Sequence, residues 1–167
     1  MSQSQNANIS LAATQPSRST EGNIDTLLYQ HLLQVQEGRL HPTAIPVSTM
    51  ERVVELGCGA DDWMFDLAKR YPRLHIYGID MDCELLRQAK LRRNLSGLPQ
   101  VEMRQMDLSQ PLLIPDRYID FVHMRRCGRF LPSRQWPSII EECIRILRPN
   151  GWLVISEPDF CEVSSPA

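Results

Sequence analysis

The sequence contains no long apolar run and no excess of positive charge. No stretch near 18 apolar residues occurs in the 167-residue chain, and the first residues, MSQSQNANISLAATQPSRST, lack the basic start and apolar segment of a signal peptide. The net charge of −2 at pH 7 provides no global basic field to attract nucleic acid or anionic lipid. We therefore expect a cytoplasmic protein that binds neither nucleic acid nor membranes.

Paired cysteines are also lacking. The five cysteines are odd in number, and no Cys-x-x-Cys or Cys/His pairing occurs, which argues against a disulfide framework and against a zinc site. We expect no bound metal. The cysteines are Cys58, Cys83, Cys127, Cys143 and Cys161.

The composition, with 43% hydrophobic and 23% charged residues, is that of one globular domain preceded by a polar N-terminus. Residues 1–22 are rich in Ser, Gln, Asn and Thr, so we expect a disordered tail. Residues 23–48 are predicted to form an N-terminal helix, with one apolar face and a stop at Gly38, and then an extended connector containing Pro42 and Pro46. The main domain is expected over 49–167.

Apolar strands alternate with amphipathic helices after the connector. Such alternation predicts an α/β fold with a doubly wound, Rossmann-like parallel sheet, whose ligands bind at the carboxyl ends of the strands where the strand order reverses. The expected strands are 51–56, 74–79, 101–105, 118–123 and 152–156. The expected helices are 62–70, 83–95 and one through 139–147.

Two glycines follow the first of these strands. Gly57 and Gly59 permit a tight turn and let a ligand approach the backbone, although a generic strand-to-helix turn has the same pattern. Asp80 and Asp107 end the second and third strands, so both are expected at the same crevice. Asp80 is either a ribose ligand or, like Asp82, the N-cap of the next helix.

The charge around the glycine turn bears on the cofactor. Asp61 and Asp62 at the helix start would repel a dinucleotide pyrophosphate, unless they only cap the helix and face solvent. A pocket edged by Glu55, Asp61, Asp80 and Asp107 suits a positively charged nucleoside without phosphate. S-adenosylmethionine is such a molecule.

Four segments in order carry a family resemblance. VVELGCGADDWMFDLAKRYP, IYGIDMDCELLRQAK, VEMRQMDLSQPLLIPDRYIDFVHMR and IRILRPNGWLVISEPD resemble class I S-adenosylmethionine-dependent methyltransferases over residues 49–159. The preceding TLLYQHLLQVQEGRLHPTAIP is similar to the segment before this domain in methyltransferases related to fungal regulators of secondary metabolism.

The resemblance implies a role for each matching residue. Glu55 would order the loop and reach the methionyl amino group, with Gly57, Cys58 and Gly59 in the loop itself. Asp61 stands where the family has a third glycine. The remaining implied contacts are Asp80 with the ribose, Met81 with adenine, Asp107 and Leu108 with the adenine edge, and His123 and Met124 beside the methyl donor and the substrate.

The family's sheet has seven strands in the order 3-2-1-4-5-7-6, whereas this sequence stops at Ala167, after the fifth. We therefore expect the order 3-2-1-4-5 without the last two strands. The fifth strand, Trp152 to Ser156, would then be a bare sheet edge, open to aggregation or to a partner chain.

The implied reaction is SN2 transfer of a methyl group to a small-molecule acceptor, with alignment and desolvation in place of a dedicated catalytic side chain. One alternative is a non-catalytic S-adenosylmethionine-binding fragment or half of a split methyltransferase. Another is an NAD-dependent oxidoreductase. Three features stay open. Tyr29 and His31 either close over the pocket or only pack, and His123 is either a catalytic base or only hydrogen-bonded. The arginine cluster either steers an acidic acceptor or is a solvated loop; it consists of Arg125, Arg126 and Arg129.

Overall fold

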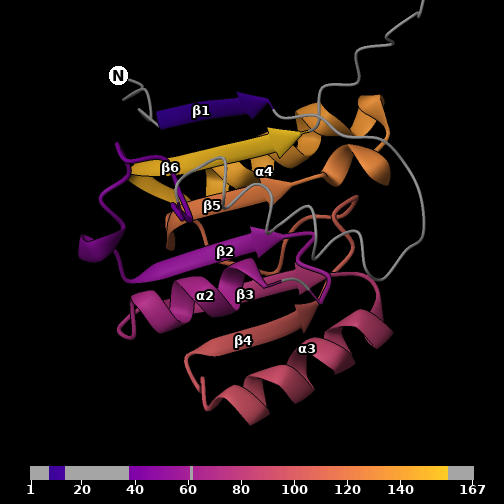
Figure 1. The fold of residues 1–167 in the computed structure, drawn as a ribbon. Helices are drawn as coiled ribbons and strands as arrows, with labels where there is room; N and C mark the ends of the chain where they lie inside the picture. Colours follow the sequence, from indigo (N-terminus) through magenta and orange to yellow (C-terminus); the bar gives the residue numbers. More distant parts are fainter. Residues whose placement is uncertain (1–7, 14–37, 61, 158–167) are drawn as a thin grey trace, which may run out of the picture.

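The computed structural model describes residues 8–13, 38–60 and 62–157. In this part of the chain six strands form one sheet in the order β1-β6-β5-β2-β3-β4, and every neighbouring pair is parallel (Figure 1). The strands are β1 (Asn8–Ala13), β2 (Arg52–Leu56), β3 (His75–Asp80), β4 (Val101–Gln105), β5 (Ile119–Arg125) and β6 (Leu147–Glu157).

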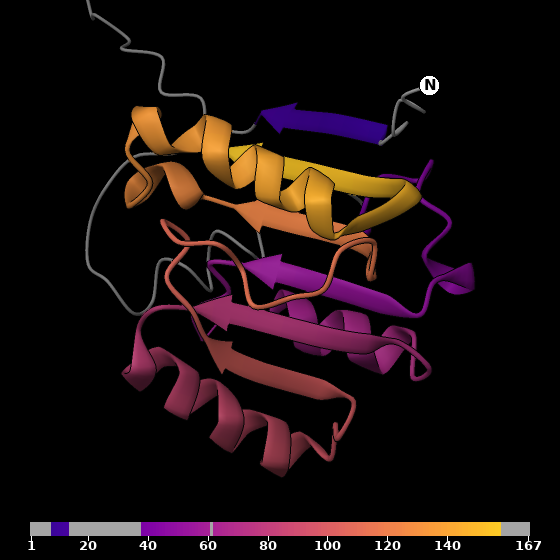
Figure 2. The same cartoon turned by 180° about the vertical axis from the view of Figure 1, so that it is seen from behind.

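Helices cover both faces of this sheet. The helix α2 (Trp63–Arg70) lies in front of the sheet in Figure 1, and α4 (Trp136–Ile146) lies in front of β5 and β6 in the reverse view of Figure 2. The helix α3 (Cys83–Ser96) lies beside β4, and its buried residues join the same core as those of α2. Three short 3-10 helices connect the elements: η1 (Val47–Thr49), η2 (Cys127–Arg129) and η3 (Ser133–Gln135). Among the described residues, no helix combines the length and the apolar composition needed to cross a bilayer.

Burial on both faces explains the apolar strands at the centre of the sheet. Alternate residues of β2 and β5 enter two separate cores, because successive side chains of a strand point to opposite faces. Val53 and Phe121 pack on the side of α2, while Val54 and Val122 pack on the side of α4. All four are fully buried, so the doubly wound arrangement has a core on each face of the sheet.

The ends of α3 are fixed by local chemistry. The Asp82 carboxylate caps the helix by accepting hydrogen bonds from the backbone N–H groups of Glu84 and Leu85 at 2.9 and 3.1 Å. Gly97 ends the helix in the left-handed conformation, with φ of +64°. This helix therefore begins directly after β3, at the carboxyl edge of the sheet.

The predicted strand order is confirmed for five strands. In the expected numbering, β4-β3-β2-β5-β6 is the order 3-2-1-4-5, and each strand lies within a few residues of its expected position. The α/β prediction is therefore correct, and the point of order reversal lies between β2 and β5.

The predicted tail and the predicted bare edge need correction. Asn8–Ala13, expected in a disordered tail, form β1, which pairs with β6 from Asn8 opposite Trp152 to Ala13 opposite Glu157. Backbone hydrogen bonding along β6 orders this segment, so the edge of β6 is covered. A partner chain at that edge stays a prediction. The expected helix over 23–37, with Tyr29 and His31, lies outside the described residues.

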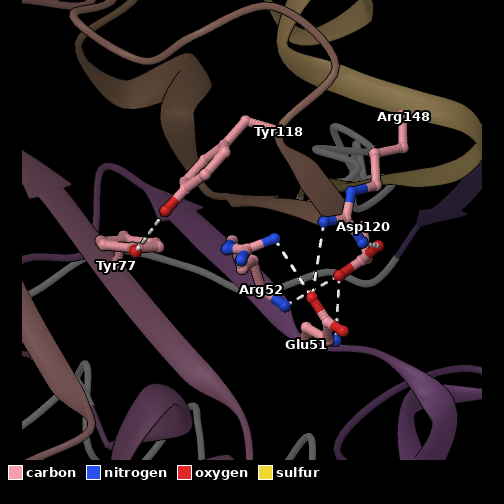
Figure 3. Close-up of polar contacts among 6 residues, drawn as sticks. All are labelled: Glu51, Arg52, Tyr77, Tyr118, Asp120 and Arg148. Carbon is pink, nitrogen blue, oxygen red and sulfur yellow. Dashed lines mark hydrogen bonds and ion pairs between the residues drawn. The ribbon is translucent and has the colours of Figure 1, made fainter.

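A polar cluster joins three strands at the end of the sheet where the strands begin, opposite their carboxyl ends (Figure 3). We call this end the amino edge. One Asp120 carboxylate oxygen accepts from the backbone N–H groups of Glu51 and Arg52 at 2.9 and 2.8 Å, and the other accepts from Arg148 at 2.8 Å. The Arg52 guanidinium also lies 4.4 Å from the ring centroid of Tyr118. Asp120 thus ties β5 to the segment entering β2 and to β6.

Candidate functional site

A cavity of about 490 Å³ lies at the carboxyl edge of the sheet, beside the switch point between β2 and β5. This volume lies in the range of about 300–1,000 Å³ that is typical of small-molecule sites. The cavity is lined by the loop after β2, the ends of β3 and β5, the start of α3, the segment after β4 and the turn after β5. Its lining residues are Gly57, Cys58, Gly59, Ala60, Asp80, Met81, Asp82, Leu85, Gln88, Asp107, Leu108, Ser109, Arg125, Arg126, Arg129, Phe130, Leu131 and Gln135.

The glycine loop forms one wall with its backbone. Gly57 and Gly59 both adopt left-handed φ values, +72° and +54°, which residues with a Cβ adopt at a cost. The N–H groups of Gly57 and Cys58 donate to the Ile79 carbonyl at 2.8 and 3.0 Å, so the loop is held against the end of β3. A Cβ on Gly57 would lie 2.7 Å from Cζ of Phe130. Gly57 thus permits the close contact of this ring with the loop.

Asp80 faces the glycine loop rather than capping α3. Its Oδ2 accepts from the Gly59 N–H at 2.8 Å and its Oδ1 from the Asp82 N–H at 2.9 Å, whereas Asp82 is the N-cap. Each carboxylate oxygen has a second lone pair, so Asp80 keeps acceptor capacity for a hydroxyl in the cavity. The N-cap of α3 is therefore Asp82, and the role of Asp80 as a ribose ligand stays a prediction.

The segment after β4 contributes Asp107 and Leu108. The exposed Asp107 carboxylate accepts from the Ser109 N–H at 2.8 Å, and hydrogen bonds from Ser109 lower the pKa of this carboxyl. Leu108 is buried, while Met81, on the neighbouring loop, has 62% of its surface exposed. The cavity therefore offers a carboxylate and an apolar surface side by side.

Glu55 and His123 are not brought to the cavity surface. They are register partners on adjacent strands and therefore point to the same face of the sheet, where Trp63 of α2 stacks on the imidazole with ring centroids 4.0 Å apart. Nδ1 of His123 lies 3.5 Å from Oε1 of Glu55. Burial, with a smaller effect from the charge of Arg125, lowers the pKa of His123 well below its usual value, so the imidazole is neutral at pH 7.

The acidic start of α2 differs from its sequence-based interpretation. The Asp62 carboxylate pairs with the guanidinium of Arg92 on α3, which also donates to the Ala60 carbonyl at 2.8 Å. This cation offsets the charge that we expected to repel a pyrophosphate. Asp61 lies outside the described residues. The acidic character of the cavity therefore comes from three other carboxylates, Asp80, Asp82 and Asp107.

The opposite wall of the cavity is basic. Arg125 ends β5, Arg126 follows it, and Arg129 ends η2, and all three line the cavity. The cavity is thus lined by aspartates on the β3 and β4 side and by arginines on the β5 side.

Sequence reasoning pointed to the three arginines as a possible acceptor cluster but missed other lining residues. Leu85 and Gln88 line the cavity because α3 starts at the carboxyl edge, as its Asp82 cap indicates. Phe130 and Gln135, which follow the arginine cluster, carry no such sequence signal.

Comparison with known proteins identifies the family of this chain. A family model described as a methyltransferase domain matches residues 53–151, which is more than half of the chain. The chain belongs to this methyltransferase family. Its cofactor is accordingly S-adenosylmethionine, and the division of charge in the cavity fits that cofactor, since a carboxylate wall suits a nucleoside that carries a sulfonium and an ammonium group.

Relatives of the methyltransferase include enzymes and regulators. A trans-aconitate 2-methyltransferase of Azoarcus sp. (strain BH72) is 32% identical over 114 residues, which cover 68% of this chain and 42% of that protein. The secondary metabolism regulator laeA of Monascus pilosus is 28% identical over 110 residues, covering 65% of this chain and 27% of that protein. The chain thus spans less than half the length of these two curated relatives.

Solved structures share the fold. A putative S-adenosyl-L-methionine-dependent methyltransferase from Methanococcus maripaludis superposes with a TM-score of 0.65 at 19% identity, covering 84% of this chain and 67% of that one. The PH0226 protein from Pyrococcus horikoshii OT3 gives a TM-score of 0.66 at 20% identity, with 79% and 59% covered. Neither the oxidoreductase nor the non-catalytic alternative gains support from these comparisons.

Proposed function

We propose that the chain transfers a methyl group from S-adenosylmethionine to a small anionic acceptor held in the same cavity. The observation that carries the proposal is the division of charged residues across the cavity, with aspartates lining one side and arginines lining the other. A cationic donor and an anionic acceptor would each be attracted to a different wall, which orients them toward one another.

On the donor side, the carboxylates would bind and orient S-adenosylmethionine. Asp80 is proposed to accept hydrogen bonds from the ribose hydroxyls, because it lies at the end of β3 with acceptor capacity left beyond Gly59 and Asp82. Asp107, Leu108 and Met81 would hold the base, with the apolar side chains against the ring. Gly59 leaves the loop backbone accessible for close approach.

Glu55 and His123 are proposed to act from below the cavity. The Glu55 carboxylate lies beneath the loop, so it would stabilise the shape of the loop and favour a cation above it through the field of its charge. His123 is neutral at pH 7 and stacked on Trp63, and we assign it a packing role beside Glu55.

On the acceptor side, Arg126 and Arg129 are proposed to bind carboxylate groups of the acceptor, since guanidinium groups pair with carboxylates in a bidentate manner. The names of similar proteins agree with this chemistry, because several are trans-aconitate 2-methyltransferases. A tricarboxylate of this kind is the probe that we would test first.

The chain's contribution to the reaction is alignment and exclusion of water. When bound, S-adenosylmethionine supplies a methyl group already activated by its sulfonium, so the protein needs to place the acceptor atom in line with it. Phe130 and Leu131 lie on the rim and in the wall of the cavity, where they would limit the access of water. No side chain is assigned as a general base.

The donor assignment is tested by calorimetric titration of S-adenosylmethionine, S-adenosylhomocysteine and NAD into the wild type, Asp80→Ala and Asp107→Ala. We expect both sulfur nucleosides to bind and NAD not to bind. Loss of the charge-assisted hydrogen bonds of Asp80 should weaken binding by about tenfold or more.

Glu102→Gln serves as the matched control, because Glu102 is an exposed carboxylate of β4 that pairs with Arg104 away from the cavity lining. Its affinity for S-adenosylhomocysteine should equal that of the wild type. A folded wild-type sample that gives no heat with either sulfur nucleoside would overturn the proposal.

A further inference from the structure

The turn after β5 carries the acceptor-side arginines in an unusual backbone conformation. Arg126 has a φ of +57°, in the left-handed region that is unfavourable for a residue with a Cβ. Cys127 to Arg129 then form η2. A left-handed residue next to right-handed ones turns successive N–H groups toward one point and creates a concave nest for an anion.

Three successive N–H groups of this turn are bound by the end of β6. The N–H of Arg126 donates to the Ser156 carbonyl at 2.9 Å. The N–H of Cys127 donates to Oε1 of Glu157 at 2.7 Å, and the N–H of Gly128 donates to Oε2 at 3.0 Å. The Glu157 carboxylate therefore fills the nest with both of its oxygens.

Gly128 is fitted to this carboxylate. A Cβ added to Gly128 would lie 2.9 Å from Oε2 of Glu157, which is closer than real Cβ atoms approach an oxygen. The φ of Gly128 is not in the left-handed region, so its backbone conformation would accept alanine. Glycine at this position thus serves the approach of the carboxylate.

Opposing effects act on the pKa of the Glu157 carboxyl, and together they raise it. Half-burial raises the pKa of the Glu157 carboxyl, while the hydrogen bonds from Gly128 and Cys127 and the charge of Arg126 lower it. The Cys127 thiol also faces this carboxylate, and burial raises the pKa of that thiol, so it stays protonated.

From this geometry we propose that Glu157 is a positioning residue for the acceptor side of the cavity. Its carboxylate binds the backbone of the turn from Arg126 to Arg129 as a clamp and so holds these two arginines at the cavity. Glu157 is not itself a lining residue, and it acts through the backbone of the turn. The inference rests on the proposed function, because only there does the turn bind an acceptor.

The first test reads the clamp without any ligand. In ¹H–¹⁵N spectra recorded against pH, the amide protons of Cys127 and Gly128 should shift together with one common pKa, raised above that of an ordinary glutamate. Glu157→Gln should abolish this shared titration, because the amide side chain does not ionise. Independent titration of the two amides, or a shared titration that survives in Glu157→Gln, would overturn the clamp.

The second test reads its consequence for binding. S-adenosylhomocysteine and then trans-aconitate are titrated into the wild type and Glu157→Gln. We expect the affinity for trans-aconitate to fall by about tenfold or more and that for S-adenosylhomocysteine to change by less than about twofold. A merely structural role would weaken both equally, and that result, like no change in either, would overturn the proposal.

Gly128→Ala tests the same contact from the side of the turn. It should lower the affinity for trans-aconitate as Glu157→Gln does, because its Cβ displaces the Glu157 carboxylate. The double variant Glu157→Ala/Gly128→Ala should bind trans-aconitate with the same affinity as Glu157→Ala alone, since no carboxylate remains to be displaced. Glu102→Gln is the matched control. If the wild type binds neither ligand, the proposed function fails, and the amide titration alone supports or overturns the clamp.

Discussion

The position of a polar residue along its strand decides whether its side chain reaches the cavity. Asp80 ends β3 and reaches the cavity, whereas Glu55 lies inside β2 and is 1% exposed. The sequence predicts both residues as site residues but does not predict that only Asp80 lines the cavity. A polar residue at the end of a strand can turn upward to a ligand, while one inside the strand is committed to one face.

The buried imidazole predicts a pH dependence of stability. Because the pKa of His123 in the folded protein lies well below its usual 6.5, the unfolded chain binds the proton more tightly below pH 6.5. The free energy of unfolding should therefore fall as the pH drops from about 6.5 toward the folded-state pKa, by up to about 1.4 kcal/mol per pH unit. Urea unfolding at several pH values measures this slope.

His123→Asn should lower the stability overall and flatten the slope between about pH 5 and 6.5. The exposed His75 of β3 provides the control, and His75→Asn should keep the wild-type slope. An unchanged slope in His123→Asn would show that another group causes the pH dependence.

At the scale of elements, β1 marks the limit of what the sequence predicts. The five other strands were found from their apolar residues, which pack into the two cores. The segment NISLAA has few large apolar side chains, and its strand conformation comes from pairing along β6. Such an element depends on tertiary context, which a local pattern does not contain.

Removal of residues 1–13 should uncover the edge of β6. We expect the β6 amides that face β1 to exchange with deuterium faster, while those of β3 keep their protection, and we expect self-association to increase with concentration. Hydrogen exchange and sedimentation velocity measure the two effects. Removal of residues 1–7 alone is the control, and it should leave both unchanged.

Unaltered protection of β6 in the shorter chain, together with an unchanged monomer, would contradict the stabilising role of β1. Recovery of protection on addition of a peptide with the sequence NISLAA would support it.

At the scale of the whole molecule, stability and binding are assigned to opposite edges of one sheet. The carboxyl edge holds the cavity, and the amino edge holds the Asp120 cluster (Figure 3). The strand order, and hence the place of the cavity, could be predicted from alternating strands and helices. The arrangement of the arginines along one side of the cavity could not be predicted from the sequence, because it depends on the conformation of the turn that Glu157 binds.

Asp120→Ala should destabilise the fold without changing donor affinity. It leaves the N–H groups of Glu51 and Arg52 without their acceptor, at a cost of roughly 1–3 kcal/mol. Thermal or urea unfolding measures the loss, and titration with S-adenosylhomocysteine measures the affinity. Asp120→Asn keeps one acceptor oxygen and should cost less. A fall in affinity as large as that in Asp80→Ala would contradict the separation of the two edges.

The pairing of β1 with β6 also bears on how the chain is made. The partners Asn8 and Trp152 are 144 residues apart (152 − 8), so among the six described strands the earliest in the sequence pairs with the latest. Contacts between such distant residues form slowly. During synthesis β1 therefore waits without its sheet partner, and the nascent chain assembles its central strands before its first one.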